Sequence, residues 1–168
     1  MKRILFVCHG NICRSPMAEI ILRDMLSRRG LLAVYEVASC ATSTEEIWNG
    51  VGNPVYPPAA AELARHGLSC GGKRAVQLKK EDYDRYDLLI AMDDRNVRNM
   101  LVMLGGDPQG KIKKLMSFTG CDRDVADPWY TGAFDVTYRD IYEGCTALLD
   151  ELENRAQKLE KRKTILES

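Results

Sequence analysis

The strongest candidates for chemistry lie near the start of the chain, in residues 8–15, which read CHGNICRS. Cys8 becomes a strong nucleophile once its thiol has lost its proton. Arg14 follows six positions later, and its planar guanidinium can bind two oxygens of a phosphate group at once. Gly10 and Asn11 tolerate left-handed backbone conformations, which a loop needs when its N–H groups wrap an oxyanion. The spacing of Cys8 and Arg14 is weak as a bare pattern, but its place between a buried strand and a capped helix predicts that Cys8 attacks a phosphate ester held by Arg14.

The flanking segments predict the elements that would position this loop. Residues 3–7 are a continuous run, RILFV, typical of a parallel strand buried on both faces. Ser15 and Pro16 suit the start of a helix, whose N-terminus attracts anions and favours a thiolate. The alternative, a buried strand-end cysteine beside a surface arginine, fits the whole octet less well. A nucleotide-binding loop is disfavoured, because its second glycine and its Lys-Ser/Thr pair are missing.

The rest of the chain alternates strand and helix patterns. This predicts an α/β fold: a four-stranded parallel sheet with helices on both faces and the phosphate-binding loop between the first strand and the first helix. We expect one domain, residues 1–152, and a charged helical C-terminal tail, residues 153–168. The expected strands are 3–7, 35–39, 88–92 and 111–116. The expected helices are 15–30, 59–66, 93–104 and 136 to about 163, with long loops at 40–58 and 117–132.

The charge balance and the cysteine content argue against several classes of function. Lys+Arg 24 balance Asp+Glu 24, so a broad nucleic-acid or anionic-membrane surface is not expected. The apolar run at residues 4–7 is too short for a signal peptide, and no stretch approaches the ~20 apolar residues of a membrane span. We therefore expect a cytoplasmic protein. Six cysteines with no C-x-x-C spacing and only two histidines exclude a zinc-finger type of site.

The two long loops carry further candidates. Asp127 precedes Pro128 and is a carboxylic acid that could face the pocket as a proton donor, although Asp-Pro is also a common turn sequence. Aromatic side chains could wall the pocket and stack on a phenyl ring. These rim candidates are Trp48 with Asn49 on the first loop and Trp129 with Tyr130 on the second. For Trp48, packing within its own loop is the alternative.

These residues resemble a known family. Residues 8–16, CHGNICRSP, look like the signature of the low-molecular-weight protein tyrosine phosphatases. The resemblance extends from residue 1 to about residue 152. It includes Ser39 and the segments 52–54, 65–67, 87–93 and 127–130. It implies a four-stranded parallel sheet flanked by helices, and an activity that needs no metal or cofactor.

The resemblance also implies a role for each site residue. Cys8 would take the phosphoryl group as a phosphocysteine, and Arg14 would bind the phosphoryl oxygens. Asp127 would protonate the leaving oxygen and then activate the water that hydrolyses the intermediate. The backbone that would hold the phosphate comprises His9, Gly10, Asn11, Ile12, Cys13 and Arg14.

Supporting roles are implied as well. Ser15 would stabilise the Cys8 thiolate, and Asn11 would brace the loop in contact with Ser39. In this family a cysteine at the place of Cys13 can form a reversible disulfide with the nucleophile.

The sequence also departs from the family pattern. Trp129 replaces the first of two adjacent tyrosines, and Lys73 stands where many members have a histidine that supports the phosphate loop. His9 replaces a hydrophobic residue and could contact the substrate. The 40–58 loop is about four residues longer than in many members. Ile12 favours phosphotyrosine, because relatives that act on phosphoarginine tend to have threonine there.

The predicted function is a phosphomonoesterase that acts on protein phosphotyrosine and small aryl phosphates. An arsenate reductase on the same fold is one alternative, but it needs a close cysteine pair, and Cys70 and Cys121 are far apart in the sequence. A silent phosphate-binding module is another, and intact Cys8, Arg14 and Asp127 argue against it. The expected partner is a phosphotyrosine protein; the oligomeric state stays open.

Overall fold

A four-stranded parallel sheet forms the centre of the molecule. The computed structural model describes residues 1–167 and orders the strands β2-β1-β5-β6. The predicted α/β fold is confirmed. The strands are β1 (Lys2–Cys8), β2 (Tyr35–Ala41), β5 (Leu88–Ala91) and β6 (Ile112–Lys114).

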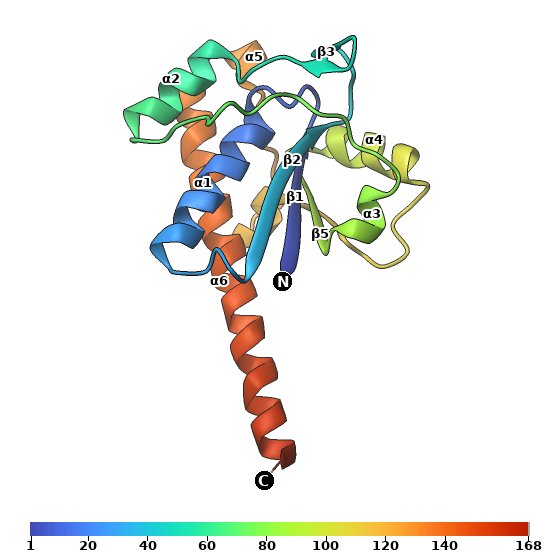
Figure 1. Ribbon diagram of the computed structural model, residues 1–168, viewed down its shortest axis with the longest axis vertical. Helices are drawn as coiled ribbons and strands as arrows, with labels where there is room; N and C mark the ends of the chain where they lie inside the picture. The colour runs from blue at the N-terminus through green and yellow to red at the C-terminus, as the bar shows by residue number, and fades with distance from the viewer. Residues whose placement is uncertain (168) are drawn as a thin grey trace.

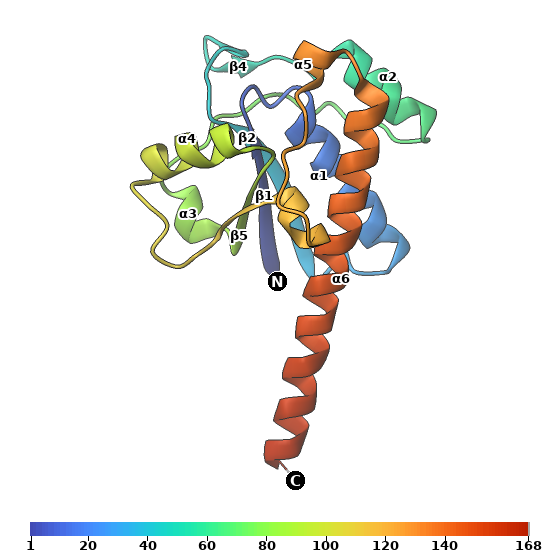
Figure 2. The ribbon, with the colours of Figure 1, turned by 180° about the vertical axis from the view of Figure 1, so that it is seen from behind.

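The central strand β1 is apolar on both sides because helices cover both faces of the sheet (Figures 1 and 2). Ile4 and Phe6 are buried in the core cluster formed with α1 (Arg14–Arg28) and α6 (Phe134–Glu167). Leu5 and Val7 face the opposite side, in the cluster that includes residues of α3 (Asp82–Arg85) and α4 (Asp94–Leu104). The loop that follows β1 is therefore held between two packed layers.

The long loops contain short elements that the sequence analysis left as loop. A hairpin of β3 (Ile47–Trp48) and β4 (Val51–Gly52) lies within residues 40–58 and is followed by α2 (Pro57–Arg65). Strand β6 is shorter than expected, because Leu115 and Met116 turn into a buried 3₁₀ helix, η1 (Leu115–Thr119), that packs against α6. A single helical turn, α5 (Pro128–Thr131), lies within the second long loop, residues 117–132.

The last helix continues well past the body of the protein (Figure 1). Leu152 is still buried, whereas every residue from 154 to 167 is exposed. Ser168, the last residue of the tail expected at 153–168, lies outside the described residues. None of the helices within residues 1–167 is long and apolar enough to cross a membrane.

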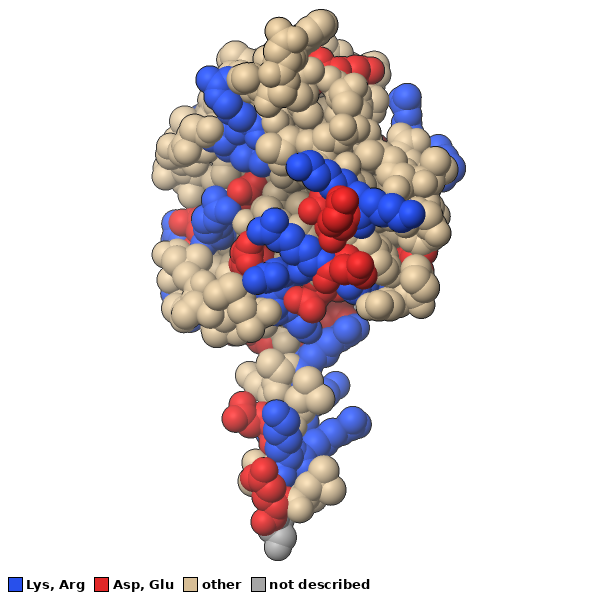
Figure 3. Space-filling model, turned by 45° about the vertical axis from the view of Figure 1, so that its right-hand side comes forward, with Lys and Arg blue, Asp and Glu red and all other residues tan. Residues whose placement is uncertain are grey.

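Charged side chains of both signs are interspersed on the face shown in Figure 3 and along the projecting part of α6. That face carries no broad region of one sign. This mixture agrees with the balanced count of acidic and basic residues.

Candidate active site

Residues 8–14 form a loop from the carboxyl end of β1 to the start of α1, where ligands of parallel sheets bind. Asn11 has a positive φ of 58°, as the loop prediction required, whereas Gly10, the other residue named for a left-handed conformation, does not have a positive φ. The loop forms one side of a pocket of about 210 Å³. The pocket is lined by Cys8, His9, Gly10, Asn11, Ile12, Cys13, Arg14, Glu45, Glu46, Arg95, Asp127, Trp129 and Tyr130.

The Cys8 sulfur is surrounded by hydrogen-bonding groups. Its Sγ accepts a hydrogen bond from the backbone N–H of Asn11 at 3.3 Å and lies 3.0 Å from the Ser15 hydroxyl. The sequence suggested Ser15 as the helix cap, but α1 begins at Arg14, and Ser15 lies inside the first turn. Its buried hydroxyl is thereby turned toward Cys8, where donors favour the thiolate form.

Asn11 braces the loop from within. Its Nδ2 donates to the hydroxyls of Ser15 and Ser39 at 2.8 and 2.9 Å, and its Oδ1 accepts from the Val76 N–H at 3.0 Å. All three side chains, Asn11, Ser15 and Ser39, are buried. The loop is thus tied to α1, to β2 and to the segment that runs beside β2.

Lys73 extends this network. Its Nζ donates to the backbone oxygen of Ser39 at 3.0 Å and lies 3.5 Å from the Glu19 carboxylate. The Ser39 hydroxyl donates to the same carboxylate at 2.5 Å. Lys73 therefore contacts the residues that brace the loop.

Arg14 is buried, with a side chain only 3% exposed. Its Nη1 donates to the Asp93 carboxylate at 2.6 Å and to the Val125 carbonyl at 2.9 Å, and its Nη2 donates to Asp127 at 3.3 Å. Burial alone would lower the pKa of this guanidinium, but the surrounding negative charges raise the pKa above its ordinary value. Arg14 is therefore a fixed positive charge at the pocket.

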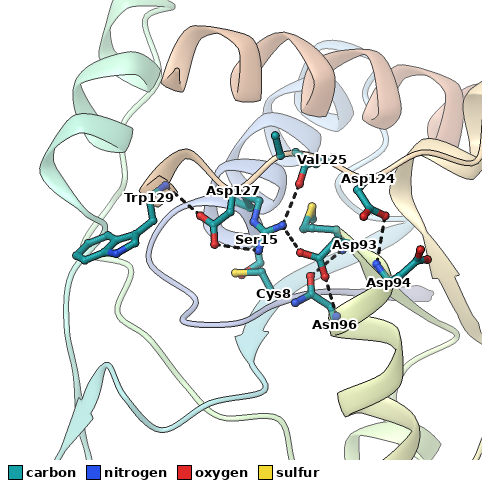
Figure 4. Close-up of polar contacts among 12 residues, drawn as sticks. Cys8, Ser15, Asp93, Asp94, Asn96, Asp124, Val125, Asp127 and Trp129 are labelled. Atoms are coloured by element: carbon teal, nitrogen blue, oxygen red, sulfur yellow. Dashed lines mark hydrogen bonds and ion pairs between the residues drawn. The ribbon is translucent and has the colours of Figure 1, made fainter. Parts of the chain in front are cut away.

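Asp127 reaches the pocket from the second long loop. It caps α5, where one carboxylate oxygen accepts from the Trp129 N–H at 3.1 Å and the other faces Arg14. Figure 4 shows it beside Cys8 and Ser15. Its side chain is 26% exposed, so the carboxyl group borders both the buried arginine and the open pocket. The structure brings Asp127 from a distant part of the chain to the pocket that Cys8 and Arg14 also line.

The four predicted rim residues divide into two pairs. Trp129 and Tyr130 line the pocket, and the Trp129 ring packs on Tyr56 with ring centres 5.0 Å apart. Trp48 and Asn49 lie at the β3–β4 turn, outside the set of pocket-lining residues. From their loop, Glu45 and Glu46 line the pocket instead.

His9 also lines the pocket, as the sequence suggested. Its Nε2 lies 3.0 Å from the Glu45 carboxylate, while its Nδ1 is buried without a hydrogen-bond partner among residues 1–167. The sequence analysis gave no role to Glu45, Glu46, Arg95 or Asp93. For Asp93 a signal existed, because it directly follows a predicted strand and so had to lie at the carboxyl edge of the sheet.

Of the six cysteines, all described and all free, Cys8 and Cys13 line the pocket. Cys13 is buried, and burial together with the charge of Cys8 raises the pKa of its thiol to about 12. Cys70 and Cys121 lie away from the pocket lining, which gives no support to a cysteine relay. Within residues 1–167 no group of three His, Cys, Asp or Glu side chains is arranged to hold a metal ion.

Comparison with known proteins identifies this arrangement. A sequence model described as "Low molecular weight phosphotyrosine protein phosphatase" matches residues 3–159. The low molecular weight protein-tyrosine-phosphatase YfkJ of Bacillus subtilis is 37% identical over 159 residues, which cover 94% of this chain and 99% of YfkJ. The crystal structure of YfkJ matches with a TM-score of 0.87 over 92% of this chain and 96% of that chain.

Two further structures are similar. The low molecular weight protein tyrosine phosphatase from Streptococcus pyogenes is 35% identical, with a TM-score of 0.79 over 90% of this chain and 93% of that chain. A structure titled YwlE arginine phosphatase is 26% identical, with a TM-score of 0.77 over 90% of this chain and 95% of that chain. The chain therefore belongs to the low molecular weight phosphotyrosine protein phosphatases, a family of cysteine-dependent hydrolases.

Proposed function

We propose that the chain hydrolyses phosphotyrosine in proteins, and small aryl phosphates, through a phosphocysteine on Cys8. The observation that carries the proposal is the meeting of a nucleophile, an anion-binding guanidinium and a carboxylic acid at one pocket. Cys8 Sγ has two donors around it, and Arg14 is fixed by its carboxylate and carbonyl partners. Asp127 lies beside Arg14 at the open side.

The reaction proceeds in two displacements. The Cys8 thiolate attacks phosphorus, and the bond from phosphorus to the ester oxygen breaks while Asp127 gives that oxygen its proton. The resulting Asp127 carboxylate then takes a proton from water, which attacks the phosphocysteine and releases inorganic phosphate and the Cys8 thiolate. Arg14 and the backbone N–H groups of the loop bind the phosphoryl oxygens as their charge redistributes.

The walls favour an aromatic ester. Trp129 and Tyr130 border the pocket above the loop, where they can stack on a phenyl ring. Ile12 also lines the pocket, at the position where relatives that act on phosphoarginine tend to have threonine. A cysteine mechanism needs a reduced thiol, so we place the activity in the cytoplasm.

The test is hydrolysis of 4-nitrophenyl phosphate and of a phosphotyrosine peptide in the presence of a chelator. Cys8→Ser should abolish turnover and still bind inorganic phosphate, because Arg14 and the loop backbone remain. Acid quenching of the wild-type enzyme during turnover should trap phosphate on Cys8. A Cys8→Ser enzyme with near-normal turnover would overturn the mechanism, and faster cleavage of a phosphoarginine peptide or arsenate reduction with a thiol would overturn the substrate assignment.

A further inference from the structure

The loop that delivers Asp127 has no regular structure between η1 and α5. Its backbone is attached to the body at a few points. The Val125 N–H donates to the Met92 carbonyl at 2.8 Å, and the Thr137 hydroxyl donates to the Ala126 carbonyl at 3.3 Å. Three residues before Asp127, Asp124 accepts a hydrogen bond from the Asp94 N–H at 3.2 Å. Asp124 and Asp94 lie side by side in Figure 4.

A lysine also takes part in this contact between Asp124 and Asp94. Lys114, the last residue of β6, is 8% exposed, and its Nζ meets three carboxylates. The distances are 2.9 Å to Asp94, 3.0 Å to Asp124 and 3.3 Å to Asp122. The ammonium is buried while its three partners are 48–74% exposed.

The surroundings of Lys114 determine whether its side chain is charged. Burial alone would lower the pKa of the Lys114 ammonium, but hydrogen bonds to the three carboxylates raise the pKa well above its ordinary value. Lys114 therefore stays charged at neutral pH. Without it, three carboxylates from two segments would face one another and repel.

The two segments are the ones that organise the catalytic acid. Asp94 begins α4, directly after Asp93, which binds Arg14. Asp122 and Asp124 belong to the loop that ends in Asp127. One ammonium at the end of a core strand therefore links the acid loop to the helix start that orients Arg14.

We infer that Lys114 is a positioning residue for Asp127: by binding Asp94, Asp122 and Asp124 together, it fixes the acid loop over Cys8. The inference rests on the proposed function, because it takes Asp127 as the proton donor. Lys114 itself is outside the set of pocket-lining residues, so it acts through the loop and not on the substrate.

The experiment compares two esters. Lys114→Met should slow the formation of phosphoenzyme from phenyl phosphate about tenfold to hundredfold, since a displacement of about 1 Å can cost that much. It should slow formation from 4-nitrophenyl phosphate far less, because that leaving group needs little help from an acid. The matched control is Lys113→Met, the same change at the exposed neighbour in β6, which should leave both rates as in the wild type.

A second comparison separates positioning from a general loss of structure. In an Asp127→Asn background the proton donor is gone, so adding Lys114→Met should cause no further loss with phenyl phosphate. An equal loss with both esters, or the same loss with and without Asp127, would overturn the inference. If Lys114→Met does not fold, Asp124→Asn weakens the same contact and should show the same ester dependence to a smaller degree.

The outcomes for the two proposals are distinct. A wild-type enzyme inactive on both esters, or an active Cys8→Ser enzyme, would refute the proposed function. Active wild-type and inactive Cys8→Ser enzymes, with no ester dependence in Lys114→Met, would refute only the role of Lys114.

Discussion

At the scale of single residues, the first prediction concerns Asp127, the proposed proton donor, whose side chain is 26% exposed and lies between the Arg14 guanidinium and open solvent. Asp127→Asn keeps the shape of the side chain but cannot supply a proton. We expect cleavage of phenyl phosphate to slow by roughly 10²–10⁴ and that of 4-nitrophenyl phosphate by less. Burst kinetics would separate phosphoenzyme formation from its hydrolysis. An equal slowing of the first step for both esters would show that another group is the donor.

Cys13 gives a second residue-scale prediction. Mild peroxide should inactivate the enzyme, and a thiol reductant should restore it through a Cys8–Cys13 disulfide. Because the pKa of Cys13 is raised to about 12, little of it is thiolate at neutral pH, so disulfide formation should accelerate about tenfold per unit of rising pH between 7 and 9.

The control is Cys13→Ser, in which the loss of activity should become harder to reverse, because the oxidised Cys8 can react further. Peptide mapping identifies the partner of Cys8. Equal recovery of both proteins, or a Cys8 paired with another cysteine, would refute the pairing.

How well the sequence predicts a site residue depends on how far along the chain that residue lies from the residues it contacts. Cys8, Asn11 and Arg14 lie in one short loop, and its place between a predicted strand and a predicted helix indicates an anion site. Asp127 needed the family resemblance, because no local pattern separates a catalytic Asp-Pro from a turn. Lys114 could not have been found, since its role depends on three carboxylates that only the folded chain assembles.

At the scale of elements, the contact between η1 and α6 depends on Gly144. A Cβ at this position would lie 2.5 Å from Cγ of Leu115, which is fully buried. Alanine favours a helix by about 1 kcal/mol over glycine, but overpacking a core costs about 1–3 kcal/mol. We expect Gly144→Ala to lower the free energy of unfolding by about 1 kcal/mol, as urea titration would measure.

The matched control is Asn154→Ala, at an exposed position of the same helix, where the helix propensity acts alone and a small gain is expected. If Gly144→Ala were as stabilising as Asn154→Ala, the close packing of Leu115 against α6 would be wrong.

The elements differ in how clearly their sequences predict them. The apolar run before Cys8 predicts a buried strand, and the structure has the strand β1 there. The β3–β4 hairpin was missed although Asn49 and Gly50, both with positive φ, are a frequent pair in two-residue hairpin turns. Its strands have two residues each, too few to show alternation. The end of β6 was misplaced because a buried 3₁₀ turn and a buried strand have equally apolar sequences.

At the scale of the whole molecule, we expect residues 156–168 to be dispensable for catalysis. The ion pairs of Arg29 with Asp150 and Glu153, which tie α6 to the body, lie before such a cut, as does buried Leu152. Truncation after Arg155 should leave kcat/KM within about twofold of the full chain, because the catalytic end is untouched.

Truncation after Leu148 is the control, because it also removes the buried side chains of Leu149 and Leu152. Each should cost about 2–5 kcal/mol of stability, as large core deletions do. Loss of activity on truncation after Arg155 would show that the projecting part of α6 contributes to the site.

The projecting end of α6 and the loop between β1 and α1, whose residues line the pocket, lie at opposite ends of the molecule (Figures 1 and 2). From residue 154 the helix extends by about 20 Å at its rise of about 1.5 Å per residue. A peptide tag at the C-terminus would therefore give oriented immobilisation, with every pocket on a sensor chip or bead facing the solution. Phosphate capture by Cys8→Ser could then be recorded directly on the surface.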